Sequence, residues 1–332
     1  MKRVIATAAA LLLVIFLLPI LLVERPQGEP SGTAVLPATP SAVPTPEAAA
    51  EDGKDAQTLV RVLMEDGQVV EQTMADYLWS VTAAEMPASF EPEALKAQAV
   101  TARTYTAWKM LAGEAKHPDA DVCTNINCCQ AYISREQAAA NWGGDADFYT
   151  AKLRAAVAET DGLIMTYGGE PIQAVFFSSA DGSTEDAVAV WGNAVPYLVG
   201  VDSPEGENVP NYHTQVSFTA QQFRDIFLQS WPGADLSGSP SDWFQNRTLT
   251  ASGRVASLEV GGVEVKGTAL RTLLGLRSTS FTVETQADRV TFSVTGYGHG
   301  VGMSQYGANA LAGQGKNFRE ILTWYYTGVK IE

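Results

Sequence analysis

The sequence EPEALKAQAVTARTYTAWKML, residues 91–111, has the pattern of a long helix. Pro92 stands where the first turn of a helix would be, Glu91 and Glu93 lie at the positive end of that helix, and Gly113 follows the stretch. Alanines recur on several faces, which lets other elements approach closely from several sides. We therefore predict a long helix over residues 91–111 that is buried against its neighbours.

Strands and shorter helices are predicted on both sides of this helix. Residues 59–64 and 69–71 flank the turn sequence EDGQ and predict a hairpin, and Thr73 is placed to cap a helix that Pro87 stops near residue 85 or 86. Further elements are expected as a buried strand over 172–178, a helix after Thr219, strands within 248–265 and 281–295 around a short helix near 268–274, and helices near 303–312 and 318–326. No βαβ rhythm or repeat is visible, so we predict an α+β fold with a mixed, mostly antiparallel sheet and packed helices.

The N-terminal part of the chain divides into an apolar and a proline-rich segment. Lys2 and Arg3 precede 20 uncharged residues, 4–23, which suffice for a helix across the roughly 30 Å hydrocarbon core of a membrane. We predict a transmembrane anchor over 1–23 with its positive end inside, a flexible Pro/Ala-rich linker over 24–57, and an extracytoplasmic domain over 58–332. A cleavable signal peptide is the alternative, although no Ala-x-Ala site precedes residue 24.

The charge of the chain excludes one class of partner. The sequence has 22 Lys and Arg against 37 Asp and Glu, a net charge of −15. A protein this acidic is poorly suited to bind phosphate backbones or anionic lipid through its surface, so we expect no nucleic-acid partner.

The cysteines form the densest chemical constellation. All three, Cys123, Cys128 and Cys129, fall within seven residues, shortly after His117, which is one of three histidines. Thiolate and imidazole are preferred ligands of Zn²⁺, so we predict a structural zinc site of these four residues, which is closed if Cys128 and Cys129 both bind. A vicinal cysteine pair is awkward for a single ion, so water or another residue is the alternative to Cys128 as the fourth ligand. A Cys123–Cys129 disulfide with a spare thiol is the main alternative, and reduced core cysteines are another.

Glu85 lies in an unusual setting for an acid. It is flanked by Ala83, Ala84 and Met86 on the last turn of an apolar helix. Desolvation and the negative end of the helix dipole both raise the pKa of a carboxyl group there. A carboxylic acid that is neutral near pH 7 can donate a proton to a glycosidic oxygen. A surface glutamate at a helix end is the alternative.

A glycine-rich stretch surrounds His299. The sequence GYGHGVG, residues 296–302, is followed by MSQYG, residues 303–307. Glycines let a ligand approach backbone amides, and Ser, Gln and Tyr offer hydrogen bonds suited to sugar hydroxyl and acetamido groups. The spacing matches no phosphate-binding motif. A tight structural turn is the alternative.

Several of these motifs together resemble the stage II sporulation protein D family. The resemblance is carried by AAEMP (83–87), EALKAQAVTARTY (93–105), SSADGSTE (178–185), LRSTSF (276–281) and GHGVGMSQYGA (298–308), and it runs from about residue 58 to the end. Members of this family are lytic transglycosylases that cut peptidoglycan during engulfment of the forespore. The family's catalytic acid falls on Glu85 and its zinc site on His117, Cys123 and Cys129, with Cys128 where a second histidine would be expected.

The resemblance also implies a mechanism, a location and partners. Glu85 would protonate the oxygen between N-acetylmuramic acid and N-acetylglucosamine and then deprotonate the muramic 6-hydroxyl, which closes a 1,6-anhydro ring. The implied partners are peptidoglycan glycan strands and a membrane complex with stage II sporulation proteins P and M, with a homodimer left open. The candidate cleft residues are Ser178, Ser179, Thr184, Glu185, His299, Ser304, Gln305 and Tyr306. A wall-binding modulator that stimulates an amidase and a zinc hydrolase are the alternative functions, and the filled ligand set disfavours the hydrolase.

Overall fold

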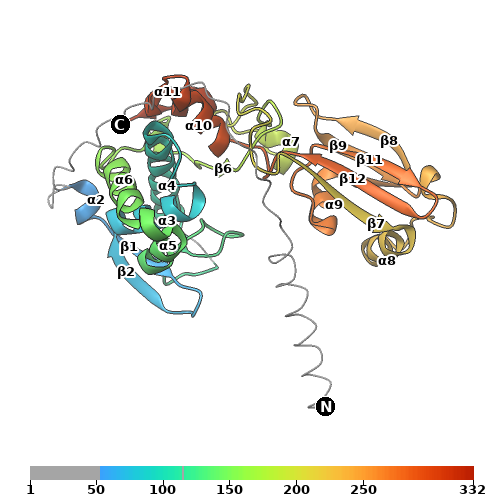
Figure 1. The fold of residues 1–332 in the computed structure, drawn as a ribbon, viewed down its shortest axis with the longest axis horizontal. Helices are drawn as coiled ribbons and strands as arrows, with labels where there is room; N and C mark the ends of the chain where they lie inside the picture. The colour runs from blue at the N-terminus through green and yellow to red at the C-terminus, as the bar shows by residue number, and fades with distance from the viewer. Residues whose placement is uncertain (1–52, 114–115) are drawn as a thin grey trace, which may run out of the picture. The chain divides into compact units, whose positions relative to one another are not determined.

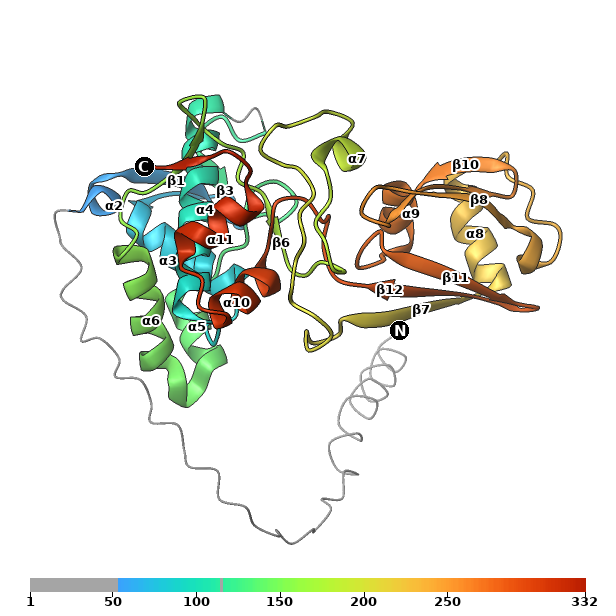
Figure 2. The ribbon, with the colours of Figure 1, turned by 90° about the horizontal axis from the view of Figure 1, so that it is seen from above.

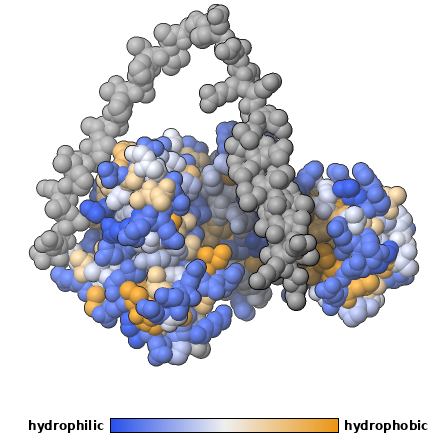
Figure 3. All heavy atoms as spheres, turned by 60° about the horizontal axis from the view of Figure 1, so that its bottom comes forward, coloured by the Kyte–Doolittle hydropathy of each residue, from blue (hydrophilic) through white to orange (hydrophobic). Residues whose placement is uncertain are grey.

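The computed structural model describes residues 53–113 and 116–332, so the expected anchor and most of the expected linker lie outside the described residues. Within this part, no helix has the length and apolar character needed to cross a membrane. The described residues form an α+β fold with several small, mostly antiparallel sheets (Figure 1), which confirms the predicted class. The face in Figure 3 is largely hydrophilic with scattered hydrophobic patches.

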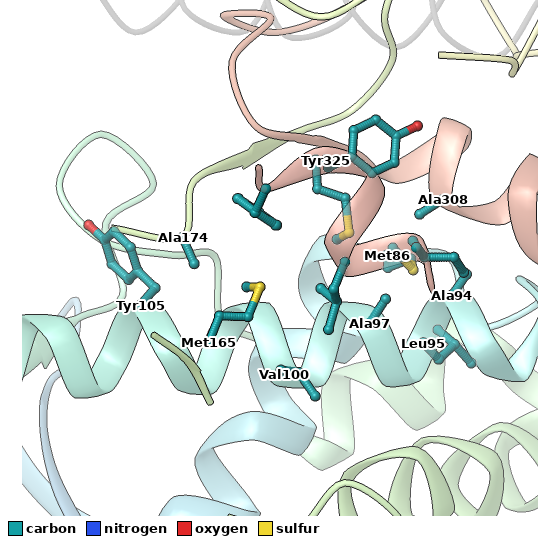
Figure 4. Close-up of a cluster of buried hydrophobic side chains, with 14 of the residues drawn as sticks. Met86, Ala94, Leu95, Ala97, Val100, Tyr105, Met165, Ala174, Ala308 and Tyr325 are labelled. Atoms are coloured by element: carbon teal, nitrogen blue, oxygen red, sulfur yellow. The ribbon is translucent and has the colours of Figure 1, made fainter. Parts of the chain in front are cut away.

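Helix α4, Pro92–Ala112, is the long helix expected from the alanine-rich stretch, and Gly113 ends it. Its buried alanines let other helices approach closely, as the sequence predicted, and Figure 2 shows helices gathered around α4. The helices that pack against α4 are α3 (Met74–Glu85), α6 (Ala146–Ala158), α10 (Gln305–Gly313) and α11 (Phe318–Tyr325). Figure 4 shows part of this core, with Ala308 of α10 and Tyr325 of α11 over α4.

The hairpin and the capped helix before α4 form as predicted, and one short strand that was not predicted joins the hairpin. Strands β1 (Leu59–Leu63) and β2 (Val69–Thr73) pair antiparallel, and the short strand β3 (Val122–Cys123) adds to β1 in parallel. The Thr73 side chain accepts a hydrogen bond from the Asp76 N–H and caps α3, which ends at Glu85.

A lobe inserted at residues 213–295 has its own hydrophobic core. It contains two three-stranded antiparallel sheets. The two helices and the strands within 248–265 and 281–295 were predicted, whereas the strand over 213–219 and most of the strand over 244–249 were not. Its elements are β7 (His213–Thr219), α8 (Ala220–Ser230), β8 (Phe244–Leu249), β9 (Val255–Val260), β10 (Val263–Lys266), α9 (Gly267–Leu274), β11 (Phe281–Gln286) and β12 (Arg289–Thr295). Buried aromatic rings, Phe223, Phe227, Trp243 and Phe292 among them, fill the space between the sheets and α8.

The strand expected over 172–178 is much shorter than predicted. Only β6 (Phe176–Phe177) is regular, and it pairs in parallel with β13 (Met303–Ser304), so α10 begins at Gln305 and not at residue 303. The residues before β6 bond to several different partners, because the Ile172 N–H donates to the Met165 carbonyl oxygen and the Gln173 N–H donates to the Tyr197 hydroxyl. The other short elements are α5 (Arg135–Trp142), β4 (Met165–Tyr167), β5 (Glu170–Pro171), α7 (Ala187–Trp191) and β14 (Lys330–Ile331).

The folded domain begins before residue 58. Helix α2, Lys54–Gln57, falls inside the segment expected to be a linker, and its Asp55 is buried. The Arg103 guanidinium on α4 donates to both Asp55 carboxylate oxygens, with Nη2–Oδ2 at 2.6 Å. The proline content predicted a flexible linker up to residue 57. The Asp55–Arg103 ion pair instead holds the last residues of that linker against the domain.

Asp55→Asn should lower the free energy of unfolding by about 3 kcal/mol, because it leaves the buried Arg103 cation without its counter-charge. Urea unfolding followed by far-UV circular dichroism measures the change. Arg135→Gln, which breaks the exposed Arg135–Asp76 pair, is the matched control and should cost less than about 1 kcal/mol. Equal effects of the two substitutions would contradict a stabilising role for the Asp55–Arg103 pair.

Candidate functional site

Glu85 is the last residue of α3 and is half-buried. Its Oε1 atom accepts a hydrogen bond of 2.6 Å from the Ala131 N–H. Burial raises the pKa of Glu85, while the Ala131 N–H and a hydrogen bond with the Gln305 side chain act in the opposite direction. The net direction is upward, as the apolar flanks of Glu85 in the sequence predicted.

Glu85 faces a cleft of about 510 Å³. Three of the candidate residues, Ser178, His299 and Gln305, line the cleft together with it. They come from β13–α10 and from the loops after β6 and β12, so the fold gathers residues that are far apart in the sequence.

The glycine-rich loop is packed too closely for side chains. A Cβ atom on Gly300 would lie 1.7 Å from Nη1 of Arg254, and one on Gly302 would lie 2.1 Å from the Val175 carbonyl oxygen. Both glycines also have positive φ, at 89° and 76°. Gly300 and Gly302 therefore allow the loop to pack closely against Arg254 and Val175.

His299 is held by both ring nitrogens. Nε2 donates to the Phe176 carbonyl oxygen at 3.0 Å, and Nδ1 accepts from the Val301 N–H at 3.1 Å. Burial, together with the charges of Arg271 and Arg254, lowers the pKa of His299 to about 4, although the bond to Phe176 opposes the shift. His299 is therefore a neutral imidazole at neutral pH, and both of its nitrogens are already in use.

The pH dependence of folding should reveal this neutral histidine. Because its folded pKa is lowered from 6.5 to about 4, the stability it provides is fully present above pH 6.5 and is lost as the pH falls toward 4. Between pH 7 and pH 5, wild-type protein should lose about 2 kcal/mol more stability than His299→Gln, measured by urea unfolding at both pH values. Parallel losses in the two proteins would mean that His299 is not held neutral.

The other candidate residues do not line the Glu85 cleft. Ser179, Thr184, Glu185 and Ser304 are buried, and their polar groups are used inside the protein. The Glu185 Oε2 atom accepts from the Ser252 hydroxyl at 2.6 Å, and the Ser304 hydroxyl donates to Glu205 at 2.5 Å. Tyr306 packs edge-on against Phe90, with ring centroids 4.9 Å apart. These residues shape the loops behind the cleft.

The four predicted metal ligands come together. The candidate donor atoms of His117, Cys123, Cys128 and Cys129 all lie within 4.8 Å of one another, and this cluster could hold a metal ion. His117 Nε2 is 3.7 Å from Cys128 Sγ and 3.5 Å from Cys129 Sγ, and the two sulfurs are 3.9 Å apart. Around a tetrahedral zinc ion, S–N and S–S separations of about 3.6 and about 3.8 Å are expected. The adjacent cysteines thus fit one ion.

Two further features suit a metal centre. The His117 Nδ1–H donates to the Ala120 carbonyl at 3.1 Å, which leaves the Nε2 lone pair directed at the sulfurs. All three cysteines are free thiols, so the structure does not contain the alternative disulfide.

The loop that carries the cysteines also reaches Glu85. Ala131, the donor to Glu85, follows Cys129 by two residues, and Gln130 between them donates to the Tyr77 hydroxyl and to Thr106 Oγ1, both at 3.3 Å. Cys129 and Gln130 line the Glu85 cleft. The conformation of the metal loop therefore fixes a hydrogen-bond donor to the candidate acid.

Sequence reasoning missed several residues of the cleft. Arg271 on α9, Tyr105 on α4 and the Gln130–Ala131 pair all line it, while Tyr297 was noted only as part of the glycine-rich stretch. Tyr105 lay in a helix interpreted as core, and Arg271 lies in a strand–helix region without any motif. Only the folded chain brings them beside Glu85.

Comparisons with known proteins place the chain in a family. A family model described as "Stage II sporulation protein" matches residues 65–167. The chain is 37% identical to "Stage II sporulation protein D" of Bacillus subtilis (strain 168) over 335 residues, covering 100% of this chain and 96% of that protein. The protein of the same name in Bacillus amyloliquefaciens is 36% identical over 337 residues.

A third relative carries a different name. "Amidase enhancer" of Bacillus subtilis (strain 168) is 29% identical over 298 residues, which cover 74% of this chain and 39% of that protein. The full-length matches agree with the resemblance seen in the motifs around Glu85, Arg103 and His299. The chain belongs to the stage II sporulation protein D family.

Proposed function

We propose that this protein is a lytic transglycosylase that cleaves peptidoglycan glycan strands between N-acetylmuramic acid and N-acetylglucosamine. Glu85 is the proposed catalytic acid and base, and the cleft is the proposed glycan site. Membership of a sporulation family supports a role in forespore engulfment.

One observation carries this proposal. Among the described residues that line the cleft, Glu85 is the only carboxylate. A hydrolase of the ordinary type needs two carboxyl groups, one as acid and one as base or nucleophile. A transglycosylase supplies its own nucleophile, the 6-hydroxyl of the muramic residue, so one carboxyl group is sufficient.

In the proposed reaction Glu85 first donates one proton to the substrate and then accepts one proton from it. Neutral Glu85 donates its proton to the glycosidic oxygen while the bond from that oxygen to the anomeric carbon breaks. The carboxylate then takes the proton of the 6-hydroxyl as that oxygen bonds to the anomeric carbon, which regenerates neutral Glu85. The raised pKa of Glu85 favours the first step, and the Ala131 N–H stabilises the carboxylate between the steps.

We further propose zinc as the ion of the His117, Cys123, Cys128 and Cys129 cluster. One histidine and three cysteines form a typical structural zinc set, and four protein ligands leave no position for a reactive water. Zinc bound there would cross-link the loop that carries Ala131. A zinc hydrolase is disfavoured for the same reason.

The location and the partners are also proposals. Residues 1–23 would anchor the protein in the cell membrane with the domain extracytoplasmic, and residues 24–52 would tether it. Retention of the full-length chain in the membrane fraction would support the anchor, whereas a mature form that begins near residue 24 would identify a signal peptide. A complex with stage II sporulation proteins P and M remains a proposal from the family.

Product analysis tests the proposed reaction. Purified full-length protein is incubated with glycan strands in water enriched in heavy oxygen, and the fragments are analysed by mass spectrometry. A transglycosylase yields 1,6-anhydro ends without heavy oxygen, because no water enters the product. Reducing ends that carry heavy oxygen would identify a hydrolase and overturn the proposal.

A non-catalytic role is the second candidate function, and the match to an amidase enhancer favours it. In that case the same assay gives no new ends, while the protein binds glycan and accelerates a partner amidase. The two functions are thus separated by one experiment with and without the amidase.

A further inference from the structure

Arg271 is an unusual cation within the cleft. It lies on α9 of the inserted lobe, is half-buried and lines the same cleft as Glu85. Its Nε atom donates to the Leu276 carbonyl oxygen at 3.2 Å. Burial lowers the pKa of Arg271, and within the described residues no carboxylate is among the charges that act on it. The terminal nitrogens of its guanidinium therefore lack an anionic partner.

The deeply buried arginines of the domain are paired with carboxylates. Arg103 binds Asp55, and Arg254 binds Asp181 and also donates to the Ser183 carbonyl oxygen. Arg277, which stacks over the Tyr297 ring of the cleft at 3.8 Å, resembles Arg271 more closely, because among the described residues it forms no ion pair with a carboxylate; its buried Nε also has no hydrogen-bond partner there. Among the described residues, Arg271 and Arg277 of the inserted lobe thus place positive charge at the cleft without a paired carboxylate.

This charge distribution is the opposite of that of the whole chain. The chain has a net charge of −15, so acids are more numerous than arginines and lysines. An arginine elsewhere on the surface would therefore readily meet an acid. A desolvated cation without a counter-charge is unfavourable, and an anionic ligand that enters the cleft removes this cost. A guanidinium also matches a carboxylate geometrically, since two parallel N–H groups meet the two oxygens.

We propose that Arg271 is a specificity-determining residue that binds a carboxylate of the substrate. The inference rests on the proposed function for the identity of the ligand as a muramic-acid-containing glycan. Such glycans offer carboxylates from two sources, the lactyl group of muramic acid where the peptide has been removed, and the attached stem peptide. A glycan of N-acetylglucosamine alone has neither. Binding of the carboxylate at Arg271 fixes which sugar meets Glu85.

The test measures binding, with cleavage as a separate readout. Three soluble glycan preparations are compared by calorimetry with full-length protein: peptide-free strands, peptide-bearing strands, and peptide-free strands whose carboxylates have been converted to methylamides. Wild-type protein should bind the methylamide form about 10- to 100-fold more weakly than the peptide-free form, as expected for a lost charged hydrogen bond. The peptide-bearing strands show which carboxylate is preferred.

The variants assign this discrimination to Arg271. Arg271→Gln should bind the peptide-free strands as weakly as wild type binds the methylamide form, and should show no preference between the two. Arg271→Lys should keep part of the preference. Arg289→Gln, at the start of β12 and exposed, is the matched control and should behave as wild type. The methylamide comparison with wild type alone tests the proposal even if Arg271→Gln does not fold.

Two results would overturn the proposal: equal binding of the acidic and methylamide strands by wild type, or an unchanged preference in folded Arg271→Gln. Neither depends on turnover. If the strands are bound with the expected preference but are not cleaved, the transglycosylase proposal fails while Arg271 keeps its role in a glycan-binding protein.

Discussion

Glu85→Gln should reduce the formation of 1,6-anhydro products at least about a thousandfold, to the level of the uncatalysed background. Glutamine keeps the size of the side chain and can still accept the hydrogen bond from the Ala131 N–H, but it cannot donate and recover a proton. General acid–base catalysis typically contributes two to four orders of magnitude, and here one group would serve both steps. Release of soluble fragments, resolved by mass spectrometry, provides the measurement.

The control for this substitution is Glu91→Gln. Glu91 is exposed at the start of α4, so the same chemical change there should leave the rate and the products unaltered. Wild-type activity should also fall as the pH rises through the raised pKa of Glu85, since only the protonated acid can donate. Anhydro products from Glu85→Gln at a rate near that of wild type would show that another group is the acid.

Cys123→Ser should remove the bound metal and lower the free energy of unfolding by about 5 kcal/mol. Structural zinc contributes roughly 10 kcal/mol or more in small peptides, and a large domain with its own cores depends on it less. Activity should fall with the metal even below the melting temperature, because the cysteine loop also carries the Ala131 donor to Glu85. Metal analysis by mass spectrometry and thermal unfolding should show both losses together.

Chelation supplies the control for this prediction. A strong chelator should bring the wild-type melting temperature down to that of Cys123→Ser and should leave the variant unchanged. Thiol titration of the unfolded, chelated wild type should find all three cysteines free, as in the structure. Metal-free wild-type protein with a single titratable thiol would instead show that two of the three cysteines form a disulfide, and would contradict the metal site.

Local patterns in the sequence predicted the regular elements well. The alanine-rich stretch predicted α4, Thr73 and Pro87 predicted the limits of α3, and the alternating residues 59–64 before a turn sequence predicted the β1–β2 hairpin. In each case the signal is contained in neighbouring residues, as a cap, a helix breaker or a periodic apolar face.

Features that depend on contacts between distant residues were not predictable in the same way. Asp55 belongs to the domain because Arg103 binds it, and the proline-rich composition before Asp55 gave no sign of that partner. Thr184 and Glu185 belong to one of the motifs that carry the family resemblance, yet their hydrogen bonds go to Val201 and Ser252 and not into the cleft. The metal cluster was accessible to sequence analysis because its four residues are close along the chain.

The close packing behind the glycine-rich loop has a consequence for inhibitor design. Gly298 lines the cleft with a φ of 122°, and a Cβ atom on it would lie 2.6 Å from the Cβ of Phe177, so a side chain at this position is strained by its backbone conformation and by this contact. A compound that is recognised by the main chain of the loop at Gly298 would meet a surface that a substitution at this position can change only at a cost in stability. Drug resistance would then arise more readily elsewhere in the cleft, at side chains such as Tyr297 or Arg271, which a compound could be designed to avoid.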